Sequence, residues 1–131
     1  MTDLGLLDTS VVIDLPQIDV SALPAELAIS AITLAELAAG PHASGDVAER
    51  AIRQQRLQWA ESTFDPIPFD AEAARYYGSM FALVLAAGRK PRRRLADLLI
   101  ASVAAANDLP LLTRNPDDFI GLEPFVTVLA V

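Results

Sequence analysis

Acidic residues recur at comparable positions in four successive parts of this chain, each near the end of a predicted strand or the start of a predicted helix. They are Asp8, Glu36, Asp97 and Asp118, with Asp117 as a second candidate for the last position. Clustered carboxylate oxygens suit a hard cation such as Mg²⁺ or Mn²⁺. One or two such ions activate water and stabilise the charge of a phosphodiester under attack. Because carboxylates within a few Å repel one another, such a cluster also needs the cation.

The elements that must position these acids alternate between strands and helices. Strands are predicted at residues 4–7, 27–32, 110–113 and 125–131, and helices at 9–15, 33–40, 44–64, 70–88 and 95–107. This alternation predicts an α/β fold, a mostly parallel central sheet flanked by helices, in a single domain over residues 1–131. Ligands bind beyond the carboxyl ends of parallel strands, so we expect the four acids to meet at that edge.

Each acid also has a purely structural interpretation. Asp8 suits the N-cap of the next helix, and Thr33 with Glu36 fits a capping box. Asp97 could complement a helix dipole, and Asp118 could form an Asx-turn. Any one of these roles is acceptable, but four of them at one sheet edge are a weaker explanation than a shared site. An ionised Asp97 beside the apolar stretch LADLLIASVAAAN is costly unless it is capping, paired or bound to a metal.

The composition excludes several other classes. With no cysteine and a single histidine, His42, the chain cannot build a disulfide scaffold, a zinc ribbon or a multi-histidine metal site. It has no P-loop and no GxGxxG motif. Ser10 stands where an aspartyl-phosphate phosphatase needs a second Asp, and Arg114 only loosely replaces the Lys of a receiver domain. No signal peptide or membrane-length apolar run is visible, so we expect a cytoplasmic protein.

The net charge of −7 conceals a concentrated basic strip, GRKPRRR. Five of the ten basic residues lie between Arg89 and Arg94. An acidic body with one basic strip could pair a cation site with a polyanion-binding edge. The alternative is that this strip is only a solvated loop.

Three motifs in order, LLDTSVVID, ITLAELAAG and LADLLIASVAAANDLPLLTRNPDDF, resemble the PIN domain, most closely the VapC-type ribonuclease toxins of bacterial toxin–antitoxin modules. The resemblance implies that Asp8, Glu36 and Asp97 are core metal-site acids. The family pattern places the fourth acid either where Asn115 stands or at Asp118, and we favour Asp118. Small polar positions lining the site would be Thr9, Ser10, Thr113 and Asn115.

The same resemblance implies Mg²⁺ or Mn²⁺ as cofactor, RNA as substrate, products with a 5′-phosphate and a 3′-hydroxyl, a homodimer, and inhibition by a VapB-like antitoxin. Arg92, Arg93 and Arg94 precede Asp97 closely enough to hold RNA phosphates, and Arg114 could do so from the other side. Two alternatives stay open at this point. One is a metal-dependent RNA- or antitoxin-binding module that does not cleave, and the other is a small metallophosphatase.

Apolar and aromatic residues in two helical segments could form partner contacts in addition to core. They are Ile52, Leu57 and Trp59 in the first segment and Tyr76, Tyr77, Met80 and Phe81 in the second. The VapC resemblance implies that such a surface receives an amphipathic antitoxin helix. An acidic groove would also attract a basic side chain of that partner toward Asp8 and Asp97.

Overall fold

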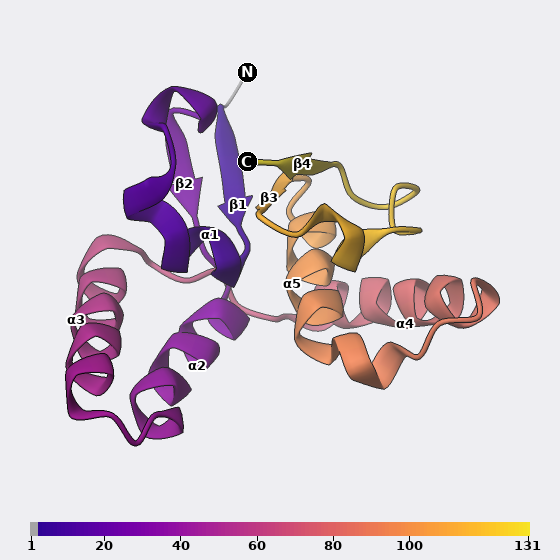
Figure 1. Cartoon of the computed structure of the whole chain (residues 1–131). Coiled ribbons are helices and arrows are strands. Elements are labelled where there is room, and N and C mark those ends of the chain that lie inside the picture. Colours follow the sequence, from indigo (N-terminus) through magenta and orange to yellow (C-terminus); the bar gives the residue numbers. More distant parts are fainter. Residues whose placement is uncertain (1–2) are drawn as a thin grey trace.

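The computed structural model describes residues 3–131, and its sheet has the strand order β2–β1–β3–β4 (Figure 1). The central strands are β1 (Leu4–Leu7) and β3 (Leu111–Thr113), and the edge strands are β2 (Glu26–Ala28) and β4 (Val128–Ala130). All three strand pairs in this sheet are parallel. The expected α/β class is therefore confirmed, although both edge strands are shorter than the sequence pattern predicted.

Helices cover both faces of the sheet. The α-helices are α1 (Thr9–Asp14), α2 (Ala31–Ala39), α3 (Val47–Thr63), α4 (Ala71–Ala86) and α5 (Leu95–Ala106). Short 3₁₀ turns link them: η1 (Leu15–Gln17), η2 (Val20–Ala22), η3 (Gly40–Ala43), η4 (Pro91–Arg94) and η5 (Pro116–Phe119). None of the helices in residues 3–131 combines the length and apolarity that crossing a membrane requires.

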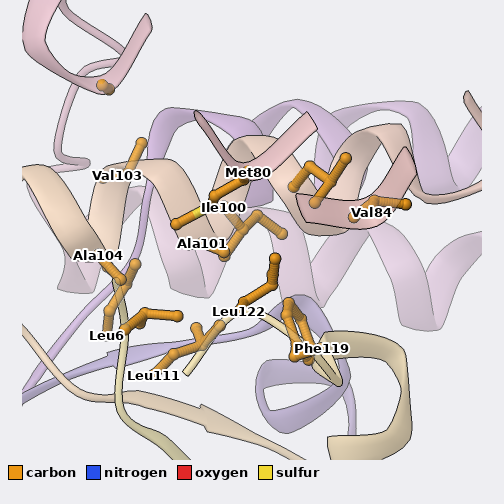
Figure 2. Packing of buried hydrophobic residues seen from close by; sticks show 13 residues of the cluster. Leu6, Met80, Val84, Ile100, Ala101, Val103, Ala104, Leu111, Phe119 and Leu122 are labelled. Atoms are coloured by element: carbon orange, nitrogen blue, oxygen red, sulfur yellow. The ribbon is translucent and has the colours of Figure 1, made fainter. Parts of the chain in front are cut away.

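The alternation of side chains along the central strands divides the core into two clusters. Leu6 and Leu111 face α4 and α5, where they pack with Met80 and Phe119 (Figure 2). Their neighbours Leu7 and Leu112 face the opposite side and join a cluster that includes residues of α1, α2 and α3. Because both faces are buried, the two central strands are apolar at every position up to the polar residue where each ends.

The start of α2 differs from the prediction. Ser30, not Thr33, is the N-cap residue, and its buried hydroxyl accepts a hydrogen bond from the Thr33 N–H at 3.1 Å. The helix therefore begins at Ala31, and β2 ends at Ala28. Five of the six residues from 27 to 32 are apolar and favoured a longer strand, whereas the cap that Ser30 provides ends it. This shift moves Thr33 into the first helical turn and Glu36 into the second.

The end of α4 is fixed by a glycine in the left-handed conformation. Gly88 has φ +75°, and its N–H donates to the Leu85 carbonyl at 2.9 Å. The next N–H, of Arg89, donates to the Val84 carbonyl at 3.0 Å, which completes a Schellman motif. A residue with a Cβ would be strained at this φ. The motif ends α4 and sets the direction in which residues 89–94 lead to α5.

Candidate active site

The four predicted acids are carried by four different elements around the carboxyl ends of the central strands. Asp8 follows β1 directly, and Glu36 lies on α2, the helix after β2. Asp97 lies in the first turn of α5, and Asp118 lies in η5, shortly after β3. Parallel strands place these connections at one edge of the sheet, as the sequence analysis expected.

Asp8 is a buried carboxylate with only 5% of its surface exposed. Its Oδ2 accepts hydrogen bonds from the Ser10 hydroxyl at 2.6 Å and from the Thr113 hydroxyl at 2.9 Å. Asp8 occupies the N-cap position of α1, yet its side chain makes no capping hydrogen bond. The interpretation of Asp8 as a side-chain cap is therefore wrong. Its carboxylate is instead held by the hydroxyls of Ser10 in α1 and Thr113 in β3.

Glu36 extends toward α1 from the exposed side of α2. Its Oε1 accepts a hydrogen bond from the Thr9 hydroxyl at 2.6 Å, and Thr9 Oγ1 also lies 3.0 Å from Thr33 Oγ1. Because Ser30 caps α2, Thr33 and Glu36 do not form the capping box considered from the sequence. Thr33 was not among the predicted site residues, because its hydroxyl was expected to cap the helix that begins there.

Asp97 shows most directly that the acids converge. The pKa of its carboxyl is raised to about 6, mainly by burial and then by the nearby charges of Asp8, Asp118 and Glu36, while Arg94 lowers it. A carboxylate feels such repulsion only from charges a short distance away in a poorly solvated place. Asp8, Glu36 and Asp118 therefore all lie close enough to Asp97 to act on it electrostatically.

Asp118 is held by an ion pair with Arg94. Its Oδ1 accepts a hydrogen bond from Arg94 Nη1 at 2.7 Å, and both side chains are partly exposed. The carboxylate thus faces η4 and the start of α5, which does not support an Asx-turn within η5. Asp117, the second candidate, is exposed, and its carbonyl is 3.4 Å from Arg89 Nη1. The side chain of Asn115 is exposed, and its backbone N–H donates to Thr113 Oγ1 at 3.0 Å.

A divalent cation fits the chemistry of this donor set. The ligating atoms available are carboxylate and hydroxyl oxygens, which hard cations prefer. Within residues 3–131, no three His, Cys, Asp or Glu side chains lie close enough together to hold a metal ion as they stand. Mutual repulsion, visible in the raised pKa of Asp97, opposes closer approach without a cation. The residues thus fit a cation in donor type and convergence, and binding requires side chains to move closer together.

The predicted phosphate-binding arginines have different surroundings. Arg93 and Arg94 line a pocket with Asp97 and Asp118, whereas Arg92 is exposed and lies outside that pocket lining. Arg114 donates to Asp14 Oδ2 at 3.2 Å and to the Val131 carbonyl at 3.0 Å. Arg114 therefore ties α1 to the segment after β4.

The predicted partner residues divide between core and surface. Met80 is completely buried, and Leu57 and Tyr77 pack against the core clusters. Ile52 and Trp59 on α3 are 50% and 40% exposed and line an apolar groove. The remaining residues lining this groove are Val12, Ile13, Leu15, Pro16, Gln55 and Arg56. Met80 is therefore a core residue, whereas Ile52 and Trp59 are exposed and available for a partner contact.

The sequence of residues 5–122 matches the profile of the PIN domain, a class of α/β domain in agreement with the parallel sheet observed here. This chain belongs to the PIN domain family. It is 40% identical over 129 residues to Ribonuclease VapC5 of Mycobacterium tuberculosis (strain ATCC 25618 / H37Rv), an alignment covering 95% of this chain and 91% of the relative. The resemblance found in the three sequence motifs is thereby confirmed.

Solved structures agree with this assignment. The crystal structure of VapBC-5 from Mycobacterium tuberculosis, a member of the VapBC family of toxin–antitoxin systems, matches with a TM-score of 0.84 and 35% identity, covering 98% of each chain. The structure of VapBC2 from Rickettsia felis, bound to a DNA fragment from its promoter, matches with a TM-score of 0.77 and 26% identity, again covering 98% of each chain.

Proposed function

We propose that this protein is a divalent-metal-dependent endoribonuclease and the toxin of a VapBC-type toxin–antitoxin pair. The observation that carries the proposal is the convergence of Asp8, Glu36 and Asp118 on the half-buried Asp97. The family assignment and the 40% identity to a protein named Ribonuclease VapC5 support RNA hydrolysis over other phosphate chemistry.

A bound Mg²⁺ or Mn²⁺ would supply Lewis acidity for the phosphodiester and for the attacking water. Asp8 is the best prepared residue to hold it, because two hydroxyls fix its Oδ2 and leave the lone pairs of Oδ1 for a cation. Asp97 faces Asp8 from α5 and would hold the same cation. The Thr9 hydroxyl orients Glu36, and Arg94 orients Asp118. These two acids would contribute through water or a second cation.

The partner that we propose is a VapB-like antitoxin that lays an amphipathic segment in the groove between α1, η1 and α3. The groove combines an apolar lining with Arg56, so the complementary segment carries apolar side chains and a carboxylate. Relatives of this chain were solved as VapBC complexes, which supports a partner of this kind. We also propose a homodimer, which light scattering of the isolated protein tests.

The test of the proposed activity uses purified protein freed of any partner. We expect cleavage of single-stranded RNA with Mg²⁺ and none with EDTA. Asp8→Asn preserves shape while removing the ligand charge, and we expect at least a hundredfold lower rate. Asp65→Asn removes an exposed acid from the segment between α3 and α4 and should cleave normally. Cleavage by Asp8→Asn at the rate of the unaltered protein would refute the proposed site.

The same preparation separates the two alternatives. A module that only binds would retain RNA without cutting it in Mg²⁺, whereas a small metallophosphatase would turn over a chromogenic phosphate ester and leave RNA intact. Either result would replace the proposed activity. Sequencing RNA ends after expression, with Asp8→Asn as the control, would then identify the RNA that is cut.

A further inference from the structure

A second pocket adjoins the four acids, between the end of α4 and the start of α5. It has a volume of about 520 Å³, and its lining consists of Gly88, Arg89, Lys90, Arg93, Arg94, Asp97 and Asp118. This volume is in the range of pockets that bind small ligands. Asp97 and Asp118 line this pocket and also belong to the group of four acids. An extended ligand lying in the pocket would therefore continue into the acid site.

The backbone around this pocket is held in place by several contacts. The Schellman motif at Gly88 sets the direction in which the chain leaves α4. Pro91 is buried at the start of η4, and the Arg93 N–H donates to the Lys90 carbonyl at 3.2 Å. Arg94 holds the opposite wall through its 2.7 Å ion pair with Asp118. Pro91 and Arg94 thus anchor the GRKPRRR strip to the rest of the fold, while Lys90, Arg92 and Arg93 present their side chains to solvent.

The charges of the pocket are unbalanced in favour of an anion. Four of the residues lining it are cationic and two are acidic. Among the ion pairs found in residues 3–131, only Arg94 of these four cations has a carboxylate partner. Lys90 and Arg93 are exposed. The rest of the chain is strongly acidic, so this is the place where a polyanion would be attracted.

We propose that this pocket is a phosphate subsite that holds the RNA backbone at a phosphate neighbouring the one to be cleaved. Lys90 and Arg93 bind that phosphate, and Arg92 does not. Arg94 is a positioning residue, because its ion pair keeps Asp118 at the junction between the subsite and the acids. This inference rests on the proposed ribonuclease function and gives the arginines of the GRKPRRR strip different roles.

The test measures binding of a fluorescein-labelled single-stranded RNA by anisotropy over a series of KCl concentrations, in an Asp8→Asn background that keeps the RNA intact. Lys90→Gln and Arg93→Gln should each weaken binding about tenfold. The double variant should lower the slope of log K against log salt by about 0.7, the value for one phosphate on a single strand. Arg92→Gln should weaken binding less than threefold, like Arg50→Gln on the exposed side of α3.

A second probe makes the subsite testable without RNA. Pyrophosphate titrated into ¹⁵N-labelled protein should shift the amide resonances of residues 88–94, and Arg93→Gln should abolish those shifts. Equal effects of Arg92→Gln and Arg93→Gln on RNA binding would overturn the subsite even if RNA is cleaved. Pyrophosphate binding at residues 88–94 in a protein that neither binds nor cleaves RNA would refute the proposed function and leave the anion subsite standing.

Discussion

Thr113 at the end of β3 donates its hydroxyl to Oδ2 of Asp8 at 2.9 Å, joining residues 105 positions apart in the chain. The same hydroxyl oxygen accepts the N–H of Asn115 at 3.0 Å. Thr113 is fully buried, so these bonds form away from competing water. The two central strands thus fix the position of the one deeply buried carboxylate of the site.

Replacing Thr113 with valine keeps the shape of the side chain and removes the hydroxyl. We expect the free energy of unfolding to fall by about 1–3 kcal/mol, because the buried Asp8 carboxylate and the Asn115 N–H each lose a partner. Urea denaturation followed by circular dichroism measures this change. Thr113→Ser retains the hydroxyl and should recover most of the loss. If the valine variant is as stable as the unaltered protein, the hydrogen bond contributes nothing.

The pKa of Asp97 predicts how stability depends on pH. Its folded-state pKa is raised to about 6, while an unfolded chain has the usual value near 3.8. Below pH 3.8 Asp97 is protonated in both the folded and the unfolded state, so its contribution to stability is fully present. Between the two values the unfolded state ionises first, and stability is lost as the pH rises. The loss is complete above the folded-state pKa.

Asp97→Asn should remove this loss of stability, because the asparagine side chain does not ionise. In metal-free buffer we expect the variant to gain about 1 kcal/mol over the unaltered protein between pH 4 and pH 7, a discounted figure because the side chain is half-exposed and solvent screens it. Urea unfolding at a series of pH values measures the gain. Asp65 is exposed and is not among the charges that act on Asp97, so Asp65→Asn should show no such trend. A constant difference between Asp97→Asn and the unaltered protein across this range would contradict the prediction.

The sequence predicted those parts of the site that depend on topology. Acids placed after strands, or at the start of the helices that follow them, had to meet at one edge once the sheet was parallel. Asp8, Glu36 and Asp97 therefore followed from residue types and element order, whereas the choice of Asp118 over Asp117 came from the resemblance to the PIN domain. The Schellman ending of α4 was likewise visible from Gly88, because a glycine after a long helical pattern favours that ending.

The hydrophobic and polar pattern of the sequence did not predict contacts between side chains that lie far apart in the chain. The pair of Arg114 with Asp14 depends on side-chain reach across 100 positions, and no periodicity encodes it. Thr33 was misplaced because Ser30, three residues earlier, is an equally good cap, and only packing decides between them. The difference between Arg92 and Arg93 likewise depends on the path of η4.

Arg94 should tune the ionisation of Asp97. Its guanidinium lowers the pKa of that carboxyl and is paired with Asp118. Arg94→Gln removes the positive charge, so the pKa of Asp97 should rise, and Arg94→Lys should restore part of the difference. The measurement is a pH titration of the Asp97 side-chain carbonyl by ¹³C NMR without metal. A pKa that is unchanged in Arg94→Gln would show that the two groups are not coupled.

Adding Mg²⁺ should stabilise the folded protein, because the proposed cation site lies where acids raise the pKa of Asp97 by repulsion. A ligand present at a hundred times its Kd stabilises the native state by about 2.7 kcal/mol. We therefore expect the melting temperature to rise with Mg²⁺ concentration in the unaltered protein and much less in Asp8→Asn. EDTA should reverse the rise. Equal responses of the two proteins would mean that Asp8 does not hold the cation.

The groove between α1, η1 and α3 is the proposed binding site of the antitoxin, and substitutions in it should weaken that binding. Ile52 lines the groove and is 50% exposed, so Ile52→Asp should leave the fold intact while placing a charge where the partner's apolar side chains must lie. Val47 is also exposed on α3 but lies outside the groove lining, and Val47→Asp is the matched control. Titration with the protein encoded immediately upstream, followed by light scattering, should show binding at least tenfold weaker for Ile52→Asp only. Equal binding by both variants would place the antitoxin on another surface.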